Sequence, residues 1–336
     1  MPSGKVRHIQ LRVNPAEAIL LKVPPTDVVN RSNHTLVNKP YQLRTGLHHE
    51  IYSHLGNCNG RNTKILAIGS STTESAFVEE GDRWTDILQK LYDEKNDGEV
   101  CVYNFGVGGN HLLHAHTIAF YTIPQLKPKL ALIMSNGTDV GHLLRNGDYF
   151  KWDLPEKSFY VEYNKNPESI WLIKKILRNI FPATFRIRDD LHLRGGNLRE
   201  PKVKNLRMDE KSISTYKTIY GQKLSELIKL VRAYGSTPIV ILEPRKVLGD
   251  SSRHKKIKDH YQFRGVKYEK FLKLHSLFNE VAQKKCETES VICIDATALN
   301  NEDMMYDEGH LNTVGSKVFA KLIFEQLRTD YDLLKK

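Results

Sequence analysis

Residues 64–74 read Lys-Ile-Leu-Ala-Ile-Gly-Ser-Ser-Thr-Thr-Glu, and this stretch decides the fold. The apolar run ending at Ile68 is bounded by polar residues, which is typical of a fully buried strand, and Gly69 closes it. Beyond Glu74 the apolar residues take up helical spacing. We therefore expect Ser71 in a strand-to-helix loop, with its hydroxyl exposed where helix amides favour developing negative charge.

The hydroxyl of Ser71 has a second interpretation. Serine and threonine are preferred helix caps, so this polar run could simply start the helix. Two other loop motifs fit less well. The stretch lacks the Gly-Lys-Ser/Thr of a phosphate loop, and Thr73 stands where Gly-x-Ser-x-Gly needs its second glycine. This loop alone leaves capping and nucleophilic catalysis open.

The rest of the chain predicts an α/β fold. Further apolar or β-branched runs, separated by helical patterns, occupy Val100–Phe105, Leu130–Met134, Pro238–Leu242 and Val291–Ile294. Strands that alternate with helices predict a parallel sheet covered on both faces, with ligands bound at the carboxyl ends of the strands.

A second motif, Asp307-Glu308-Gly309-His310, lies near the carboxyl terminus, before an amphipathic terminal helix. A neutral His310 can accept a proton from Ser71, and Asp307 can hold the correct tautomer and stabilise the imidazolium. An Asp-x-x-His at a helix start could equally be a capping arrangement. Together with a serine at the end of a buried strand, the motif favours acyl-transfer chemistry.

On these motifs the chain resembles the SGNH hydrolase superfamily, also called GDSL-type esterases and lipases. Its first block is similar to Gly69–Thr73, its second, Asn-x-x-x-x-Gly, to Asn104–Gly109, and its fifth to Asp307 and His310. The resemblance covers residues 64–328. It implies a flavodoxin-like three-layer α/β/α fold with a five-stranded parallel sheet.

The resemblance also implies roles for single residues. Ser71 would be the nucleophile, His310 the base and then the acid, and Asp307 the residue that orients His310. The amides of Ser71 and Gly109 would contribute to the oxyanion hole. No metal or organic cofactor is required.

The third block departs from the family's Gly-x-Asn-Asp. Here the sequence after the strand is Ser135-Asn136-Gly137-Thr138-Asp139, so an alignment on Asp139 places Thr138 at the asparagine position. Either the Thr138 hydroxyl or the Asn136 amide could donate to the oxyanion. Loss of one such donor typically costs about 100- to 1,000-fold in rate, so weakened catalysis and a transferase variant also stay open.

These patterns predict a serine esterase that cleaves a carboxylic ester through an acyl-enzyme. We expect a short-chain O-acyl ester, such as an acetyl ester on a carbohydrate. The alternatives are an acyltransferase with the same triad, a long-chain lipase, and a catalytically silent carbohydrate-binding protein. The residues do not identify the acyl group, the alcohol or the oligomeric state.

The expected organisation is an N-terminal arm over 1–61 and an α/β domain over 62–330 with an insertion at about 141–205. The insertion holds several aromatic residues, which could stack on sugars or line an acyl pocket as a lid. A small structural subdomain is the other interpretation. The aromatic residues concerned are Tyr149, Phe150, Trp152, Phe159, Tyr160, Tyr163 and Trp171.

The cysteines have no metal-type spacing, and two of them fall in predicted strands. We interpret Cys58, Cys101, Cys286 and Cys293 as reduced thiols of a cytoplasmic protein. The arm has no apolar run long enough for a signal peptide or a membrane span.

The net charge of +11 raises the question of nucleic acid, but the basic residues are scattered and no nucleic-acid motif accompanies them. We expect a solvated basic surface, including a loose concentration from Arg245 to Lys258. Attraction to an anionic polysaccharide, acyl carrier or membrane face is the next interpretation.

Two smaller patterns suggest cofactors and are set aside. Gly106–Gly109 would need a further glycine at His111 to be a dinucleotide fingerprint. His111, His114 and His116 match no standard metal site, and packing or lining of the active site explains them better.

Overall fold

The computed structural model describes the backbone of residues 7–9, 160–162, 263 and 329 and, in full, residues 13–52, 58, 60–95, 100–134, 136–150, 206, 208–262 and 264–328. The strands are β1 (Arg7–Ile9), β2 (Ile19–Lys22), β3 (Tyr41–Thr45), β4 (Ile51–Tyr52), β5 (Thr63–Gly69), β6 (Val100–Gly106), β7 (Leu130–Met134), β8 (Tyr160–Glu162), β9 (Thr237–Leu242) and β10 (Ile292–Asp295). The helices are α1 (Thr26–Arg31), α2 (Ser71–Glu74), α3 (Trp84–Glu94), α4 (Leu112–Leu126), α5 (Gly137–Asn146), α8 (Glu210–Ala233), α9 (Ser252–Phe263), α10 (Tyr268–Thr288) and α11 (Thr313–Thr329).

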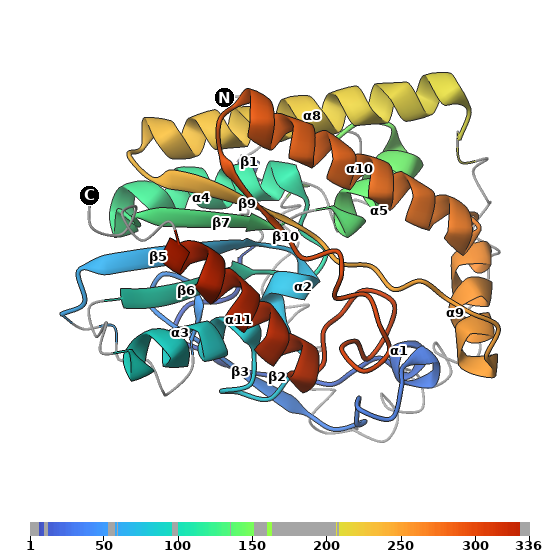
Figure 1. Cartoon of the computed structure of the whole chain (residues 1–336), viewed down its shortest axis with the longest axis horizontal. Helices are drawn as coiled ribbons and strands as arrows, with labels where there is room; N and C mark the ends of the chain where they lie inside the picture. Colours follow the sequence, from blue (N-terminus) through green and yellow to red (C-terminus); the bar gives the residue numbers. More distant parts are fainter. Residues whose placement is uncertain are drawn as a thin grey trace, which may run out of the picture. The chain divides into compact units, whose positions relative to one another are not determined.

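The main sheet has the strand order β10-β9-β7-β5-β6-β4-β3-β2, with β5 near its centre (Figure 1). The strands from β10 to β6 pair in parallel, so their carboxyl ends meet at one edge. Each lies within a residue or two of its predicted run, and the predicted α/β class is confirmed. The physical reason is that five short, continuously apolar runs can be satisfied only by burial on both faces.

The five predicted parallel strands are present, and three further strands that were not predicted extend the sheet to eight. The additional strands come from the first 61 residues: β4 pairs antiparallel with β6, β3 with β4, and β2 with β3. They escaped prediction because they are short and only half buried, and a short strand outside a buried run has a weak pattern. The domain boundary at residues 61 and 62 stays a prediction.

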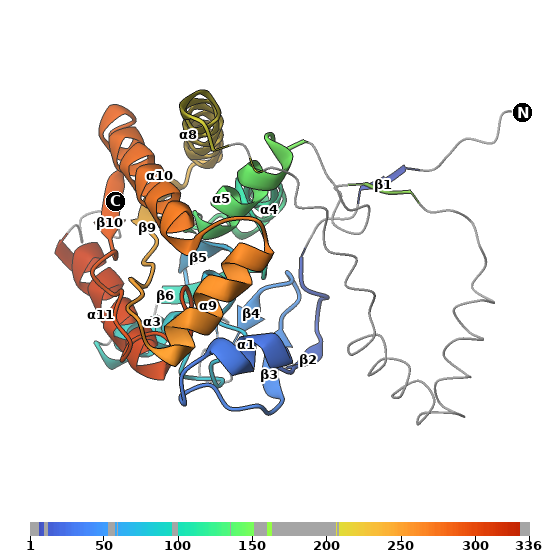
Figure 2. The same ribbon diagram turned by 90° about the vertical axis from the view of Figure 1, so that its right-hand side faces the viewer.

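Helices cover both faces of the parallel strands (Figure 2). On one face, α3 and α11 pack against the apolar side chains of β5, β7 and β9. Trp84 and Tyr92 of α3 each meet a phenylalanine of α11 edge to face, with ring centroids 5.1 Å and 5.0 Å apart. The other face carries α4, α5, α8 and α10. This packing holds the carboxyl ends of the strands in a fixed arrangement.

The chain divides into two compact units. The larger unit comprises residues 11–151 and 207–336 and contains the main sheet with its helices. The smaller one comprises residues 1–10 and 152–206, and its described part is the antiparallel pair of β1 and β8. The predicted insertion begins at residue 141, which falls inside α5, and most of it lies outside the described residues.

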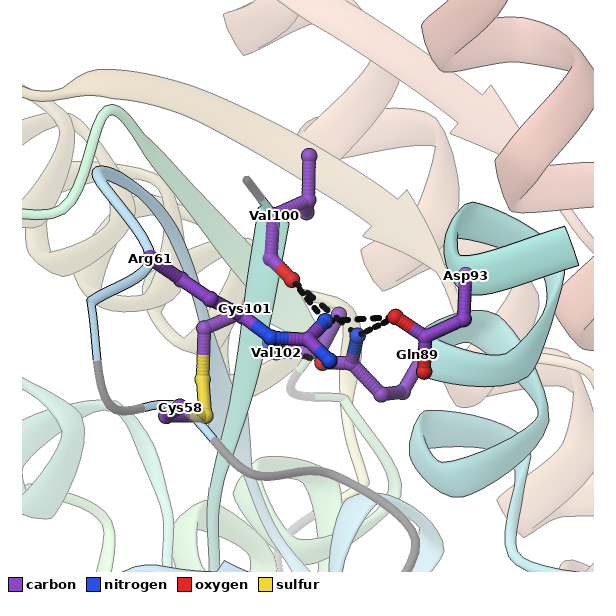
Figure 3. The surroundings of a disulfide bond; sticks show 7 residues. All are labelled: Cys58, Arg61, Gln89, Asp93, Val100, Cys101 and Val102. Carbon is purple, nitrogen blue, oxygen red and sulfur yellow. Dashed lines mark hydrogen bonds and ion pairs between the residues drawn. A yellow bond between two sulfur atoms is a disulfide. The ribbon is translucent and has the colours of Figure 1, made fainter. Parts of the chain in front are cut away.

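A disulfide joins Cys58 to Cys101 at the amino end of β6 (Figure 3). Beside it, Arg61 donates to the carbonyl of Val100 at 2.7 Å, and Gln89 of α3 donates to the same carbonyl at 3.0 Å. Gln89 also accepts from the amide of Val102 at 2.8 Å. This cross-link therefore ties the start of β6 to the segment that precedes β5, at the opposite end of β6 from the predicted catalytic loops.

A second disulfide joins Cys286 of α10 to Cys293 of β10 across a tight connection, with Cα atoms 5.8 Å apart. The interpretation of all four cysteines as reduced thiols is wrong, because chain segments that the sequence leaves unplaced bring them together in pairs. Disulfides persist in oxidising compartments, so the cytoplasmic prediction loses its support from the cysteines. Among the described helices, none combines the length and apolar character needed to cross a membrane.

Candidate active site

The loop between β5 and α2 carries Ser71 at the first position of a four-residue helix. The residue at the cap position is Ser70, and its side chain makes no capping hydrogen bond. The hydroxyl of Ser71 lies 2.7 Å from Nε2 of His310 instead. Capping therefore does not explain the side chain of Ser71. Its backbone amide lies in the first turn of α2, where amides have no hydrogen-bond acceptor within the helix.

Two glycines let this loop pack closely. A Cβ on Gly69 would collide with the side chain of Thr73 and the carbonyl of Met134, and one on Gly106 would collide with the backbone of Thr73 and Glu74. The ends of β5, β6 and β7 can approach the serine turn only because both positions lack a side chain.

His310 lies in a turn whose backbone is closed on both sides. The amide of Tyr306 donates to the carbonyl of His310 at 3.0 Å, and the amide of Asn312 donates to that of Met304 at 2.9 Å. The Tyr306 ring lies parallel to the imidazole at 5.4 Å between centroids. The imidazole is 28% exposed, so it is held in place yet open to a substrate.

Asp307 is the partner of His310 on the side away from Ser71. Its carboxylate oxygens lie 2.8 Å and 2.9 Å from Nδ1 of the imidazole. One of them also accepts from the amides of Gly309 at 2.9 Å and His310 at 2.8 Å. These bonds favour the tautomer with a proton on Nδ1, which leaves Nε2 free to accept the Ser71 proton.

The charges of this pair shift both pKa values. Burial would raise the pKa of Asp307, but His310, Arg31 and the Gly309 amide lower it well below its usual range. Burial would lower the pKa of His310, but the carboxylates of Asp307 and Glu308 outweigh that effect and raise it. Asp307 thus remains ionised and can stabilise a protonated imidazole at His310.

The second predicted loop lies beside Ser71. Glu74, which is buried, accepts from the amide of Gly108 at 2.8 Å and from Lys22 at 2.8 Å. A Cβ on Gly108 would lie 3.7 Å from the Cβ of Ser71. Gly109 follows with a φ of +81°, a conformation that favours glycine. Glu74 was not among the predicted site residues, although its place directly after the serine loop was an available signal.

The third predicted loop separates its two candidate donors. The amide of Asn136 donates to the Asn279 side chain at 2.7 Å and to the His275 carbonyl at 3.0 Å, both on α10. Both of its hydrogens are therefore used, which argues against Asn136 and in favour of Thr138 as the oxyanion donor. Packing of α10 over this loop is the physical reason. Thr138 lies in the first turn of α5, partly exposed, and stays the candidate.

Glu243, directly after β9, links two of these loops. One carboxylate oxygen accepts from the Thr72 hydroxyl and the other from the Gly137 amide, each at 2.6 Å. Burial would raise its pKa, but His275, Arg245 and the Thr72 hydroxyl lower it to about 2. A buried carboxylate thus braces the serine loop against the third loop. Glu243 was not among the predicted site residues, although a charged residue directly after a buried strand indicates a possible functional position.

We expected Arg245 on a solvated basic surface, but its side chain lies inside the protein. Its side chain is only 12% exposed and lies against two glycines of the site, Gly137 and Gly309. The expectation was wrong because the charge of a segment does not show which of its side chains point inward, and Arg245, the first of these residues, does so. The lysines and the arginine of the same concentration that lie on α9 are more exposed than Arg245; they are Arg253, Lys255, Lys256 and Lys258.

The predicted histidine group lies between helices. The ring centroid of His111 is 4.1 Å from that of His114 and 4.3 Å from that of His142, and Nε2 of His116 lies 2.8 Å from the carbonyl of Lys223 on α8. In the described part of the chain, no three His, Cys, Asp or Glu side chains form a group that could hold a metal. These rings contribute to packing near α4.

No family model matches the chain, and no curated protein is similar to it. Its fold is similar to that of a lipase/acylhydrolase from Enterococcus faecalis, with a TM-score of 0.47 and 12% identity over 80% of this chain and 97% of that one. An acetylxylan esterase from Geobacillus stearothermophilus matches with a TM-score of 0.45 and 14% identity over 81% and 95%. A putative GDSL-like lipase from Parabacteroides merdae matches with a TM-score of 0.47 and 14% identity over 80% and 98%. Similarities this low assign neither a substrate nor a residue role to this chain.

Proposed function

We propose that this chain is an SGNH-type serine esterase that cleaves a carboxylic ester through an acyl-enzyme. The observation that carries the proposal is the unbroken line of contacts from Ser71 to Nε2 of His310 at 2.7 Å and from Nδ1 to Asp307 at 2.8 Å. These side chains come from loops 239 residues apart, so local capping cannot explain their alignment.

In the first half of the reaction, Ser71 attacks the ester carbonyl while His310 takes its proton. The oxyanion that forms is stabilised by the amides of Ser71 and Gly109, with the Thr138 hydroxyl as third donor. The intermediate collapses, the carbon–oxygen bond to the alcohol breaks, and His310 returns the proton to the alcohol. Water then attacks the acyl-enzyme with His310 as base, which releases the acid and restores Ser71.

The substrate that we propose is a short-chain O-acyl ester, such as an acetyl ester, on a carbohydrate. Its support is the aromatic character of the insertion. Of those residues, Tyr149 is buried and Phe150 is 67% exposed, while the side chains from Trp152 onward lie outside the described residues. Acceptor dependence would identify an acyltransferase instead, and a preference for long acyl chains would identify a lipase.

A fluorophosphonate probe followed by peptide mass mapping tests the proposal. We expect the label on Ser71 alone, and we expect Ser71→Ala to abolish both labelling and hydrolysis of p-nitrophenyl acetate. Ser252→Ala, at the exposed start of α9, is the matched control and should retain both. Absence of any labelling in the wild-type protein would favour the silent binding protein.

A further inference from the structure

Arg245 occupies a place that the triad itself does not explain. It lies three residues beyond the end of β9, and its Nη1 atom fills the space beside two glycines. A Cβ on Gly137 would lie 2.8 Å from Nη1, and a Cβ on Gly309 would lie 2.5 Å from it. Gly309 directly precedes His310, and Gly137 directly precedes Thr138. The guanidinium therefore lies between the loop of the base and the third loop.

Aromatic rings hold the guanidinium in one orientation. Its central carbon lies 5.0 Å from the ring centroid of Phe271 and 6.0 Å from that of Tyr261. Nη2 donates to the hydroxyl of Tyr261, which in turn donates to Glu308 at 3.2 Å. A planar group stacked on rings loses little conformational freedom when it binds a ligand.

The Nη1 nitrogen of the guanidinium can donate hydrogen bonds to a ligand. Nη2 donates to the hydroxyl of Tyr261, the hydroxyl of Tyr268 also interacts with the guanidinium, and Nε is buried. In the part of the chain that the structure describes, no hydrogen bond of ordinary geometry is formed by Nη1. Glu308 lies 3.8 Å from Nη2 as an ion pair but accepts its closest hydrogen bond from Arg31 at 2.7 Å, and Glu243 accepts from Thr72 and Gly137. Arg245 is therefore a fixed cation with an unused donor at the edge of the site.

The position of His310 indicates which part of a substrate would meet this donor. In the proposed function, on which this inference rests, His310 returns a proton to the departing alcohol, so the alcohol lies on the imidazole side of Ser71. Because Nη1 lies against Gly309, which directly precedes His310, we infer that Nη1 faces that same side. A guanidinium recognises carboxylate and sulfate groups through charge-assisted hydrogen bonds. The net charge of +11 would also attract such substrates.

We propose that Arg245 is a specificity-determining residue that binds an anionic group on the alcohol part of the ester. The substrate class is then an O-acyl ester of an alcohol that carries a carboxylate or sulfate, such as an acidic sugar, rather than of a neutral one. Since both anions bind a guanidinium in the same way, their common chemistry defines the class.

A matched pair of aryl acetates tests this. With 3-acetoxybenzoate and its methyl ester, corrected for spontaneous hydrolysis, we expect the wild-type kcat/KM to favour the carboxylate at least about 10-fold, as a charge-assisted hydrogen bond allows. Arg245→Gln should lower that preference about 10-fold or more. Arg245→Lys, which keeps the charge and not the fork, should retain part of it. Lys256→Gln removes an exposed charge on α9 and should leave the preference unchanged.

The outcomes separate this inference from the proposed function. Wild-type hydrolysis of both esters without a preference for the carboxylate would overturn the role of Arg245 and leave the esterase standing. An unchanged preference in Arg245→Gln would do the same. If Arg245→Gln does not fold, the wild-type preference and the Arg245→Lys variant still decide. Hydrolysis of neither ester, with no labelling of Ser71, would overturn both.

Discussion

Arg31 donates to Glu308 at 2.7 Å, and this buried pair connects α1 to the turn that carries Asp307 and His310. Nearby, the amide of Asn33 donates to the carbonyl of Tyr306 at 2.7 Å, and its side chain donates to that of Met305 at 2.8 Å. The amino-terminal segment thus holds the turn of Asp307 and His310 as well as extending the sheet.

Arg31→Met should destabilise the fold, because it leaves Glu308 buried without its closest cation. We expect the free energy of unfolding in urea to fall by about 3 kcal/mol, with a lower kcat from a less well held His310. The double variant with Glu308→Gln should recover part of that loss. Lys39→Met, which breaks an exposed pair with Glu79, is the control and should cost less than about 1 kcal/mol. An equal loss of unfolding free energy in Arg31→Met and Lys39→Met would contradict the role of the buried pair.

The pH dependence of kcat/KM should report the raised pKa of His310. His310 must be neutral to accept a proton, so a raised pKa moves the acid limb to a midpoint above the ordinary value of about 6.5. Asp307→Asn removes the carboxylate that raises the pKa, so the midpoint should fall while a measurable rate remains. His310→Ala should remove nearly all activity. Steady-state rates from pH 5 to 9 check this, and an unchanged midpoint in Asp307→Asn would count against the assignment.

Substitutions of the two candidate oxyanion donors in the third loop, Thr138 and Asn136, should have opposite effects on turnover and stability. Thr138→Val keeps the shape but loses the hydroxyl, so we expect the turnover number to fall about 10- to 1,000-fold with little change in stability. Asn136→Ala loses two hydrogen bonds to α10, so we expect about 1 to 3 kcal/mol lower stability with turnover near that of the wild type. Esterase assays and urea unfolding separate the two. Wild-type turnover in Thr138→Val would leave the amides of Ser71 and Gly109 as the donors.

Glu243 should contribute to stability in a pH-dependent way. Because folding lowers its pKa from 4.5 to about 2, its contribution is present above pH 4.5 and is lost as the pH falls toward 2. Glu243→Gln should therefore be clearly less stable than the wild type at pH 6, and the difference should shrink by pH 3. Glu280→Gln, on the exposed side of α10, is the control. A difference that stays constant in urea unfolding at both pH values would contradict this account.

The two disulfides should differ in their effect on stability. A disulfide stabilises the fold mainly because it lowers the chain entropy of the unfolded state, and the effect grows with the length of the closed loop. The disulfide that spans 43 residues should therefore add about 4 kcal/mol to the free energy of unfolding, and the one that spans 7 residues about 2 kcal/mol. Cys58→Ser with Cys101→Ser should therefore lower the Tm more than Cys286→Ser with Cys293→Ser. Thermal unfolding of the two double variants measures this. Kinetics of the first variant should stay near wild type, since its disulfide lies at the far end of β6 from Ser71.

Local patterns in the sequence were enough to predict the five parallel strands and to place Ser71, Asp307 and His310 in loops. Each depends on a few consecutive residues: an apolar run indicates burial, a glycine ends it, and an Asp-x-x-His turn brings its own two side chains together. The carboxyl ends of parallel strands then meet at one edge whatever the details of packing. For that reason the sequence could place these three residues close together without knowledge of the remaining contacts.

Only the tertiary structure decided the partners that surround this triad. Thr72 meets Glu243 across 171 residues and Arg31 meets Glu308 across 277, and neither pair has a local sequence signal. The same holds for the cysteine pairs, the turn of Asn136 toward α10, and the inward side chain of Arg245. Such contacts depend on which distant segments pack side by side, and that is set by the summed burial of the whole core rather than by any short stretch of the chain.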